Sequence, residues 1–115
     1  MKPIDYALQE YIAILHKNAD QYAAEAGLSD NLRYNFTAEP GSKYIKIVQA
    51  TRAGMHRSVH SFVEKATANV FKPAGWRAPA KGVRYNLYGD MGLLTKVADP
   101  HGSYLYKTSA DAAHA

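Results

Sequence analysis

Hydrophobic residues recur every three or four positions over residues 4–26, which is the period of an amphipathic helix. The stripe consists of Ile4, Leu8, Tyr11, Leu15, Tyr22 and Ala26, with Ile12 and Ala19 on its flanks. Pro3 suits the first turn of such a helix, and Gly27 suits the left-handed residue that ends it. We therefore expect one long helix whose aromatic stripe faces the core.

After Gly27 the hydrophobic period changes to two, which is typical of half-buried strands. The strands expected from this pattern are residues 32–37, 43–50, 58–64 and 69–72. A Glu-Pro-Gly-Ser turn at 39–42 joins the first two strands, and a basic loop at 51–57 leads into the second hairpin. The expected fold class is α+β, an N-terminal amphipathic helix packed on a small antiparallel β-meander of about four or five strands.

The helix would cover one face of this meander and leave the other face to cations and aromatic side chains. That opposite face is expected to present Arg33, Tyr44, Lys46 and Lys72. The register of strand 58–64 leaves two alternatives open for the same face, either His60 with Phe62 or Val59 with Val63, because a one-residue slip exchanges the two faces of a strand.

From Pro73 onward the periodic pattern is lost. Residues 73–87 contain two prolines, two glycines and the only tryptophan, and we interpret them as a structured loop. Glycines punctuate residues 88–102, and residues 103–107 could form a last short strand. The expected organisation is a single domain over residues 1–107, followed by a flexible tail at 108–115.

Length and composition agree with one globular domain. The chain has 115 residues, of which 47% are hydrophobic and 21% charged, so it can bury one core. It contains no cysteine, which excludes disulfides, a thiolate nucleophile and cysteine zinc sites. No apolar run reaches the roughly 20 residues of a membrane helix, and the first residues do not resemble a signal peptide, so we expect a cytosolic protein and no membrane partner.

The positive charge of the chain is concentrated in its middle. Residues 31–87 carry ten Lys and Arg against two acids, whereas residues 1–30 carry two against five. Clustered cations are typical of surfaces that meet phosphate-bearing partners. The alternative is a solvated surface whose cations face the acidic helix of the same protein.

Residues 57–87 read RSVHSFVEKATANVFKPAGWRAPAKGVRYNL, and residues 100–107 read PHGSYLYK. This pattern resembles small uncharacterised proteins of tailed bacteriophages, which share the Ser-Val strand, a Lys-Ala-Ala-Trp segment and an Ala-Pro-Ala-Lys stretch. The chain departs from that pattern at Pro73, where alanine is usual, and at Ala68, where a turn glycine is usual. The resemblance implies a setting in the host cytoplasm, but it brings no activity and no site residues.

No motif of a known enzyme class survives inspection, so the sequence favours a non-enzymatic protein and we assign no catalytic residue. His56 and His60 are four residues apart, but no third His, Cys or carboxylate completes a metal site. His60 lies beside Ser58 and Ser61, yet nothing suggests an orienting acid or an oxyanion hole. We expect neither a metal nor a cofactor.

Cations and aromatic residues alternate in the loop after the second hairpin. Arginine grips phosphate with two donors, and an indole offers a face to a base. The predicted phosphate- and base-binding residues are Lys46, Arg57, His60, Lys72, Trp76, Arg77, Lys81, Arg84 and Tyr85. A purely structural alternative is that Trp76 closes the open end of the sheet.

Two hypotheses of function follow. In the first, the chain is a non-enzymatic phage accessory protein that binds an anionic nucleotide ligand, either nucleic acid or a host-defence signalling nucleotide that it sequesters. In the second, it is a virion component or an inhibitor of a host protein, and its basic middle meets an acidic protein surface. Both hypotheses leave homo-oligomerisation open.

Overall fold

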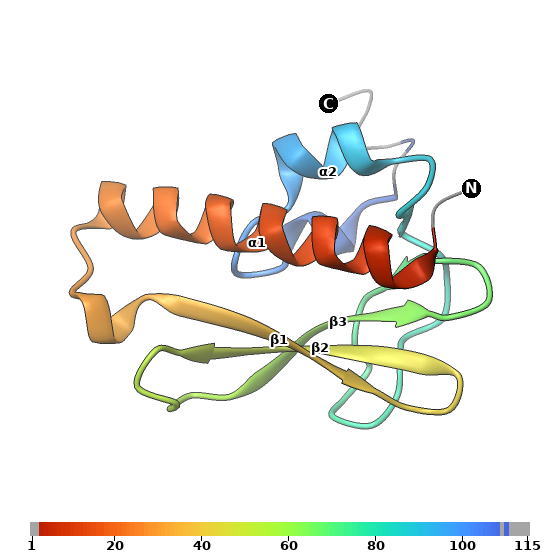
Figure 1. The fold of residues 1–115 in the computed structure, drawn as a ribbon, viewed down its shortest axis with the longest axis horizontal. Coiled ribbons are helices and arrows are strands. Elements are labelled where there is room, and N and C mark those ends of the chain that lie inside the picture. The colour runs from red at the N-terminus through yellow and green to blue at the C-terminus, as the bar shows by residue number, and fades with distance from the viewer. Residues whose placement is uncertain (1–2, 109, 111–115) are drawn as a thin grey trace.

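The computed structural model describes residues 3–108 and 110, and it has an α+β fold in which a long helix packs on a five-stranded antiparallel sheet (Figure 1). In chain order the elements are α1 (Ile4–Ala26), the 3-10 helix η1 (Asp30–Leu32), β1 (Tyr34–Pro40), β2 (Tyr44–Thr51), β3 (Ser58–Glu64), β4 (Asn69–Phe71), β5 (Tyr85–Asn86), α2 (Met91–Val97) and the 3-10 helix η2 (Ser103–Tyr106). The tail predicted at 108–115 lies outside the described residues, except for 108 and 110.

Helix α1 begins and ends where the sequence pattern predicted. Gly27 ends it with a φ of 68°, in the left-handed region that glycine adopts without steric cost. Its buried residues are Ala7, Leu8, Tyr11, Leu15, Ala19 and Ala23. The prediction that Tyr22 and Ala26 belong to the core is wrong, since both are exposed. The buried stripe advances in steps of four through Ala19 and Ala23, whose small side chains bring the helix close to its neighbours.

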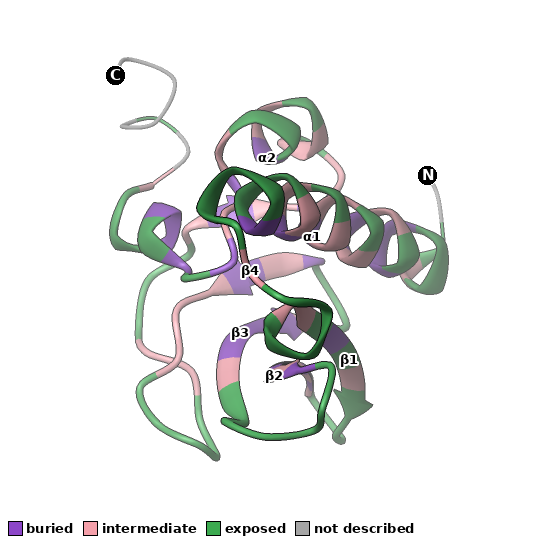
Figure 2. Ribbon diagram, turned by 90° about the vertical axis from the view of Figure 1, so that its left-hand side faces the viewer, coloured by how far each residue is buried: buried purple, intermediate pink, exposed green. Residues whose placement is uncertain are grey.

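The strands pair in the order β1-β2-β3-β4-β5, which confirms the antiparallel meander. Ile45 and Ile47 of β2 point toward α1 and belong to the core. β1 starts at Tyr34, two residues later than predicted, because Leu32 lies in η1 and is half exposed. Figure 2 shows the buried residues gathered where α1 and the sheet face each other.

A β-bulge in β3 decides which side chains occupy each face. Ile47 pairs with Ser61 and Val48 pairs with Val59, so His60 has no partner across the ladder. A bulge places two consecutive residues on one side of the sheet. His60 and Ser61 therefore both face α1, whereas Val59 and Phe62 lie on the opposite side. We call that opposite side the outer face. Each alternative predicted for this strand was therefore half right, since Phe62 but not His60, and Val59 but not Val63, lie on the outer face.

The C-terminal third differs most from the prediction. Residues 91–97 form α2, although the glycines around them concealed its helical pattern, and Leu94 of this helix is fully buried. The short strand predicted at 103–107 is wrong, because these residues form η2 after Gly102, which has a φ of 75°. β5 is only two residues long, too short to give a periodic signal.

Candidate functional site

The loop between β4 and β5 folds back on itself as a small closed hairpin. Ala80 donates its backbone N–H to the carbonyl of Lys72 over 2.7 Å, and Ala74 donates to the carbonyl of Ala78 over 3.0 Å. Pro73 and Pro79 pair at its base in an isolated bridge. The tip at residues 75–77 is thereby held against the outer face of the sheet, and it presents Trp76 and Arg77.

Two cations, Lys46 of β2 and Arg57 just before β3, lie against the indole of Trp76. The ammonium of Lys46 is 4.9 Å from the ring centroid, and the guanidinium of Arg57 is 5.6 Å from it. Both distances fall within the range of cation–π attraction. The indole keeps 44% of its surface exposed, so the predicted closing role of Trp76 is only partly met, and much of its surface remains available to a ligand.

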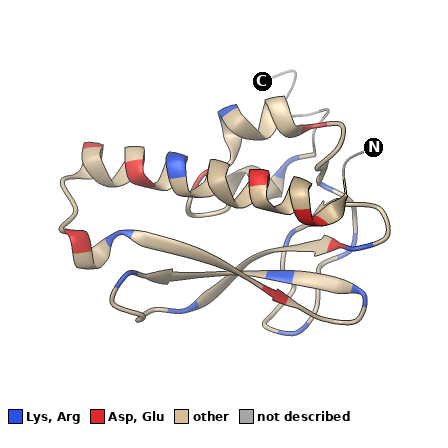
Figure 3. Cartoon of the chain, viewed as in Figure 1, with Lys and Arg blue, Asp and Glu red and all other residues tan. Residues whose placement is uncertain are grey.

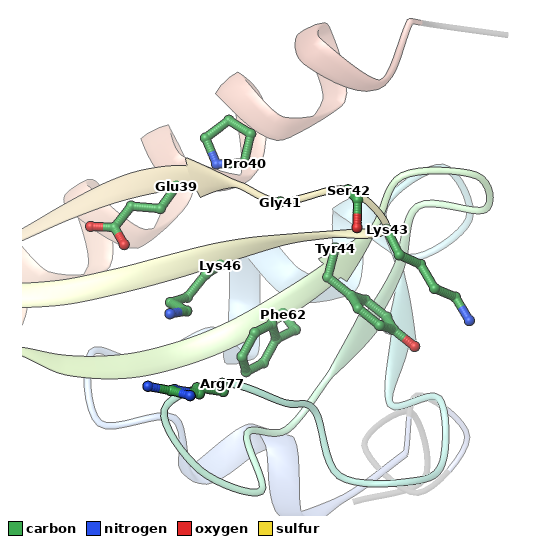
Figure 4. Close-up of a pocket in the computed structure, with 9 residues that line it drawn as sticks. All are labelled: Glu39, Pro40, Gly41, Ser42, Lys43, Tyr44, Lys46, Phe62 and Arg77. Carbon is green, nitrogen blue, oxygen red and sulfur yellow. The ribbon is translucent and has the colours of Figure 1, made fainter.

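A hollow of about 350 Å³ lies next to this cluster, between the β1–β2 turn and the loop. It is lined by Glu39, Pro40, Gly41, Ser42, Lys43, Tyr44, Lys46, Phe62 and Arg77. Figure 4 shows Phe62 between Lys46, from β2, and Arg77, from the loop. The size lies at the lower end of small-ligand sites.

Ion pairs divide the basic middle of the chain into two groups of cations. Arg52 pairs with Asp20 and Asp30, and Arg33 also lies near Asp20, so these arginines face the acidic end of α1 and η1. Arg57 pairs with Glu39 on the outer face over 2.7 Å. Figure 3 shows acids along α1 and cations on the loops below it.

A further ion pair joins Lys43 to Glu64 over 3.7 Å. Within residues 3–108, no acidic partner is recorded for Lys46 or Arg77. Internal neutralisation therefore accounts for part of the basic block, including Lys43 at the hollow, but not for Lys46 and Arg77.

Three further predicted cations lie away from this hollow. Lys72 turns to the other side and places its ammonium 4.4 Å from the ring centroid of Tyr106. Lys81 is exposed on the loop. Arg84 is half-buried, and its buried Nε has no hydrogen-bond partner among the described residues. The predicted site thus splits: Lys46, Arg57, Trp76 and Arg77 come together, and these three do not join them.

Tyr85 and His60 are corrections to the predicted site. Tyr85 is only 1% exposed, and its hydroxyl donates to the carbonyl of Tyr104 over 2.9 Å, so its ring cannot stack on a base. His60 is buried by the bulge, and burial lowers its pKa to about 4. A neutral imidazole inside the core contributes no charge to a phosphate.

The hydrogen bonds of His60 fix its tautomer. Its Nε2 lies 3.0 Å from the carbonyl oxygen of Asp99, which can only accept, so Nε2 carries the proton. Nδ1 then accepts from the Ser61 hydroxyl at 3.2 Å, and Ser61 accepts from Tyr11 at 2.9 Å. Tyr104 completes the chain by donating to Tyr11 over 2.6 Å. Every donor in this chain has an acceptor, so we assign these residues a structural role.

Sequence reasoning missed several residues that line the hollow. Tyr44 was placed on this face but not in the site, and Phe62 depended on the unresolved register. Gly41, Ser42 and Lys43 were seen only as a turn and a strand end. Their place in the sequence could have indicated them. A hairpin turn lies at the end of its two strands, so the turn at 39–42 is close to an outward-facing lysine near the start of the second strand.

The part of the chain that the structure describes contains no group of three or more His, Cys, Asp or Glu residues placed to hold a metal ion. Among the same residues, no helix is both long and apolar enough to cross a membrane.

Comparison with known protein families finds a match to one family. The sequence profile of a family of unknown function (DUF7717) matches residues 2–107. No curated protein and no solved structure matches the chain.

Proposed function

The chain belongs to this family of unknown function, and we propose that it binds a nucleic acid or nucleotide on the outer face of its sheet. One observation carries the proposal. Lys46 and Arg77 line the same hollow, and neither has an acidic partner within residues 3–108. Glu39 also lines the hollow but is paired with Arg57, so the cations there outnumber the acids and favour an anionic ligand, because binding releases the ions condensed on its phosphates.

The aromatic residues beside these cations narrow the ligand class. Trp76 is half exposed next to the hollow, and Tyr44 lines it. Single-stranded nucleic acids bind to surfaces that combine a cationic groove with aromatic rings on which bases stack. An acidic protein surface would use the cations but would not need the exposed indole. This difference favours the nucleotide ligand over the protein-interaction alternative.

The phage resemblance supplies a setting for the proposal. In the host cytoplasm the ligand would be nucleic acid, or a signalling nucleotide of host defence that the protein sequesters. A long strand would extend beyond the 350 Å³ hollow and show a steep salt dependence, whereas a small nucleotide would fit near it and show a shallow one.

The test is binding of labelled single-stranded DNA, single-stranded RNA and cyclic dinucleotides, measured by fluorescence anisotropy at low and moderate salt. Lys46→Ala combined with Arg77→Ala should weaken binding about tenfold and lower the salt slope for single strands by about 1 to 1.5. Lys17→Ala combined with Lys96→Ala removes the same charge from exposed positions of α1 and α2, and should change little. If the wild type binds none of these ligands at low salt, the proposal fails and the protein-interaction alternative replaces it.

A further inference from the structure

A second, smaller hollow lies on the α1 side of the sheet, between β2, β3 and the C-terminal segment around η2. Its volume is about 150 Å³, and it is more enclosed than the hollow on the outer face. We call it the Gln49 pocket. Its lining includes Gln49, Ser58, His60, Lys72, Leu105 and Tyr106.

The side chain of Gln49 is the unusual feature of this pocket. Gln49 is only 9% exposed, and its carboxamide makes no side-chain hydrogen bond to another described residue, yet its polar atoms are not among the fully buried ones, so they keep contact with solvent at the pocket. Amides at this depth are normally paired within the protein, and one that meets only solvent can exchange that contact for a ligand. Gln49 pairs with Phe36 across the ladder, so its side chain lies on the α1 side and borders the pocket. Its donor and its acceptor are both available to a ligand.

The lining suits a neutral ring better than a phosphate. Pro73 and Leu105 supply apolar walls, and Lys72 is the one Lys or Arg among the described lining residues. Its ammonium already lies over the ring of Tyr106, at 4.4 Å. A buried phosphate would be poorly compensated by one occupied ammonium. A planar base needs apolar contact on its faces and hydrogen bonds on its edge, and a carboxamide pairs with adenine through two hydrogen bonds.

The pocket is also connected to the outer face. It shares Ser58, Val59 and Pro73 with another hollow, which is lined in addition by Arg57 and Trp76. The two hollows meet at the edge of β3, where β4 leaves the first residues unpaired because it pairs only with Phe62 and Val63. A ligand can therefore keep its phosphates at Arg57 and turn one base around this edge.

We propose that the Gln49 pocket binds a nucleobase, with adenine preferred, and that the carboxamide of Gln49 pairs with the edge of that base. The inference rests on the proposed function and specifies which part of the ligand binds to each face of the sheet. Phosphates lie on the outer face, and the base enters the pocket on the α1 side.

Two probes test the two proposals independently, one for the base pocket and one for the phosphate site. Adenosine has a base and no phosphate, whereas an abasic oligonucleotide has phosphates and no base. Adenosine should shift the side-chain NH₂ resonances of Gln49 in the wild type, and Gln49→Leu should weaken its binding about tenfold. Gln9→Leu, the same change at an exposed position of α1, should leave adenosine binding unchanged. Lys46→Ala combined with Arg77→Ala should weaken only the abasic oligonucleotide.

Each outcome decides between the proposals. If adenosine leaves the Gln49 resonances unmoved, or binds Gln49→Leu as well as the wild type, the pocket proposal is overturned. Binding of the abasic oligonucleotide under those conditions would still support the outer face as a phosphate site. If neither probe binds, both proposals fail. The resonance shift is measured on the wild type, so it holds even if Gln49→Leu does not fold.

Discussion

The two faces of the sheet differ in whether their polar groups are paired within the protein. On the α1 side, the hydroxyls of Tyr11 and Ser61 and the imidazole of His60 belong to one chain of hydrogen bonds that ends at the carbonyl of Asp99. On the outer face, Lys46 and Arg77 share a hollow without an acidic partner in the described residues. Polar groups that pair internally stabilise a fold, whereas unpaired cations stay available to a ligand. This difference is the reason why we propose the ligand site on the outer face and give the hydrogen-bonded groups of the inner face a structural role, with Gln49 as the exception on the inner side.

The largest expected effect is a charge placed under α1. Leu15 is fully buried in the core cluster, so Leu15→Asp should cost at least about 4 kcal/mol through the lost packing and the buried carboxylate. That is most of the stability of a typical domain, and the variant should be unfolded by circular dichroism and thermal melting. Ala13→Asp lies on the exposed side of the same helix and should cost less than about 1 kcal/mol. An unchanged melting temperature for Leu15→Asp would reject the assigned helix face.

The second effect is a loss of stability in mild acid. The folded pKa of His60 is about 4, below its ordinary value of 6.5, so the unfolded chain binds more protons between these values. Stability from the neutral imidazole is complete above pH 6.5 and is lost as pH falls toward 4. Burial also lowers the pKa of His16, whose Nε2 accepts the backbone N–H of Phe36, and this adds a loss of the same sign.

Urea unfolding at pH 7 and pH 4.5 measures this effect. The free energy of unfolding should fall by about 2 to 3 kcal/mol from His60 alone. A variant with His60→Gln keeps a polar side chain without titrating, and its stability should vary less over the same interval. Equal pH dependence in the variant and the wild type would contradict the role given to His60.

The sequence was most informative where one period persists over many residues. The helix over 4–26 has the predicted bounds, because its burial repeats along its length, and the strand over 58–64 also has them although its burial is not periodic. Short or interrupted elements escaped prediction. Residues 85–86 carry too few positions to show a period, and the glycines at 89 and 92 obscured a helix that is held by its buried Leu94.

The candidate site could be predicted only in part, for a physical reason that lies in β3. The bulge at His60 reverses the faces of the strand midway, and no sequence period signals where a bulge occurs. His60 was therefore assigned to a ligand although it is buried. Trp76 and Arg77 were found because they occupy a loop between prolines, whose closed shape presents them together. The role proposed for Gln49 could come only from the structure, because the sequence does not show that its side chain lines a pocket.

A smaller effect is expected from Glu39, the acid that lines the hollow of the outer face. Glu39 pairs with Arg57, and exposed pairs of this kind contribute about 0 to 1 kcal/mol to stability. Glu39→Gln should leave the melting temperature nearly unchanged and strengthen binding of single-stranded DNA about two- to threefold, because it releases Arg57 and removes a negative charge from the hollow. Glu25→Gln on α1 is the matched control. Weaker binding by Glu39→Gln would show that the pair positions Arg57 for the ligand.

The most direct measurement uses the fluorescence of Trp76, which is the only tryptophan in the chain and contacts both Lys46 and Arg57. Single-stranded oligonucleotides added to the wild type at low salt should change its emission in a saturable manner, and the midpoint should move to higher concentration as salt is raised. The same titration of the Lys46→Ala and Arg77→Ala double variant should require about tenfold more oligonucleotide. Emission that stays constant at low salt throughout the titration would contradict binding at the outer face.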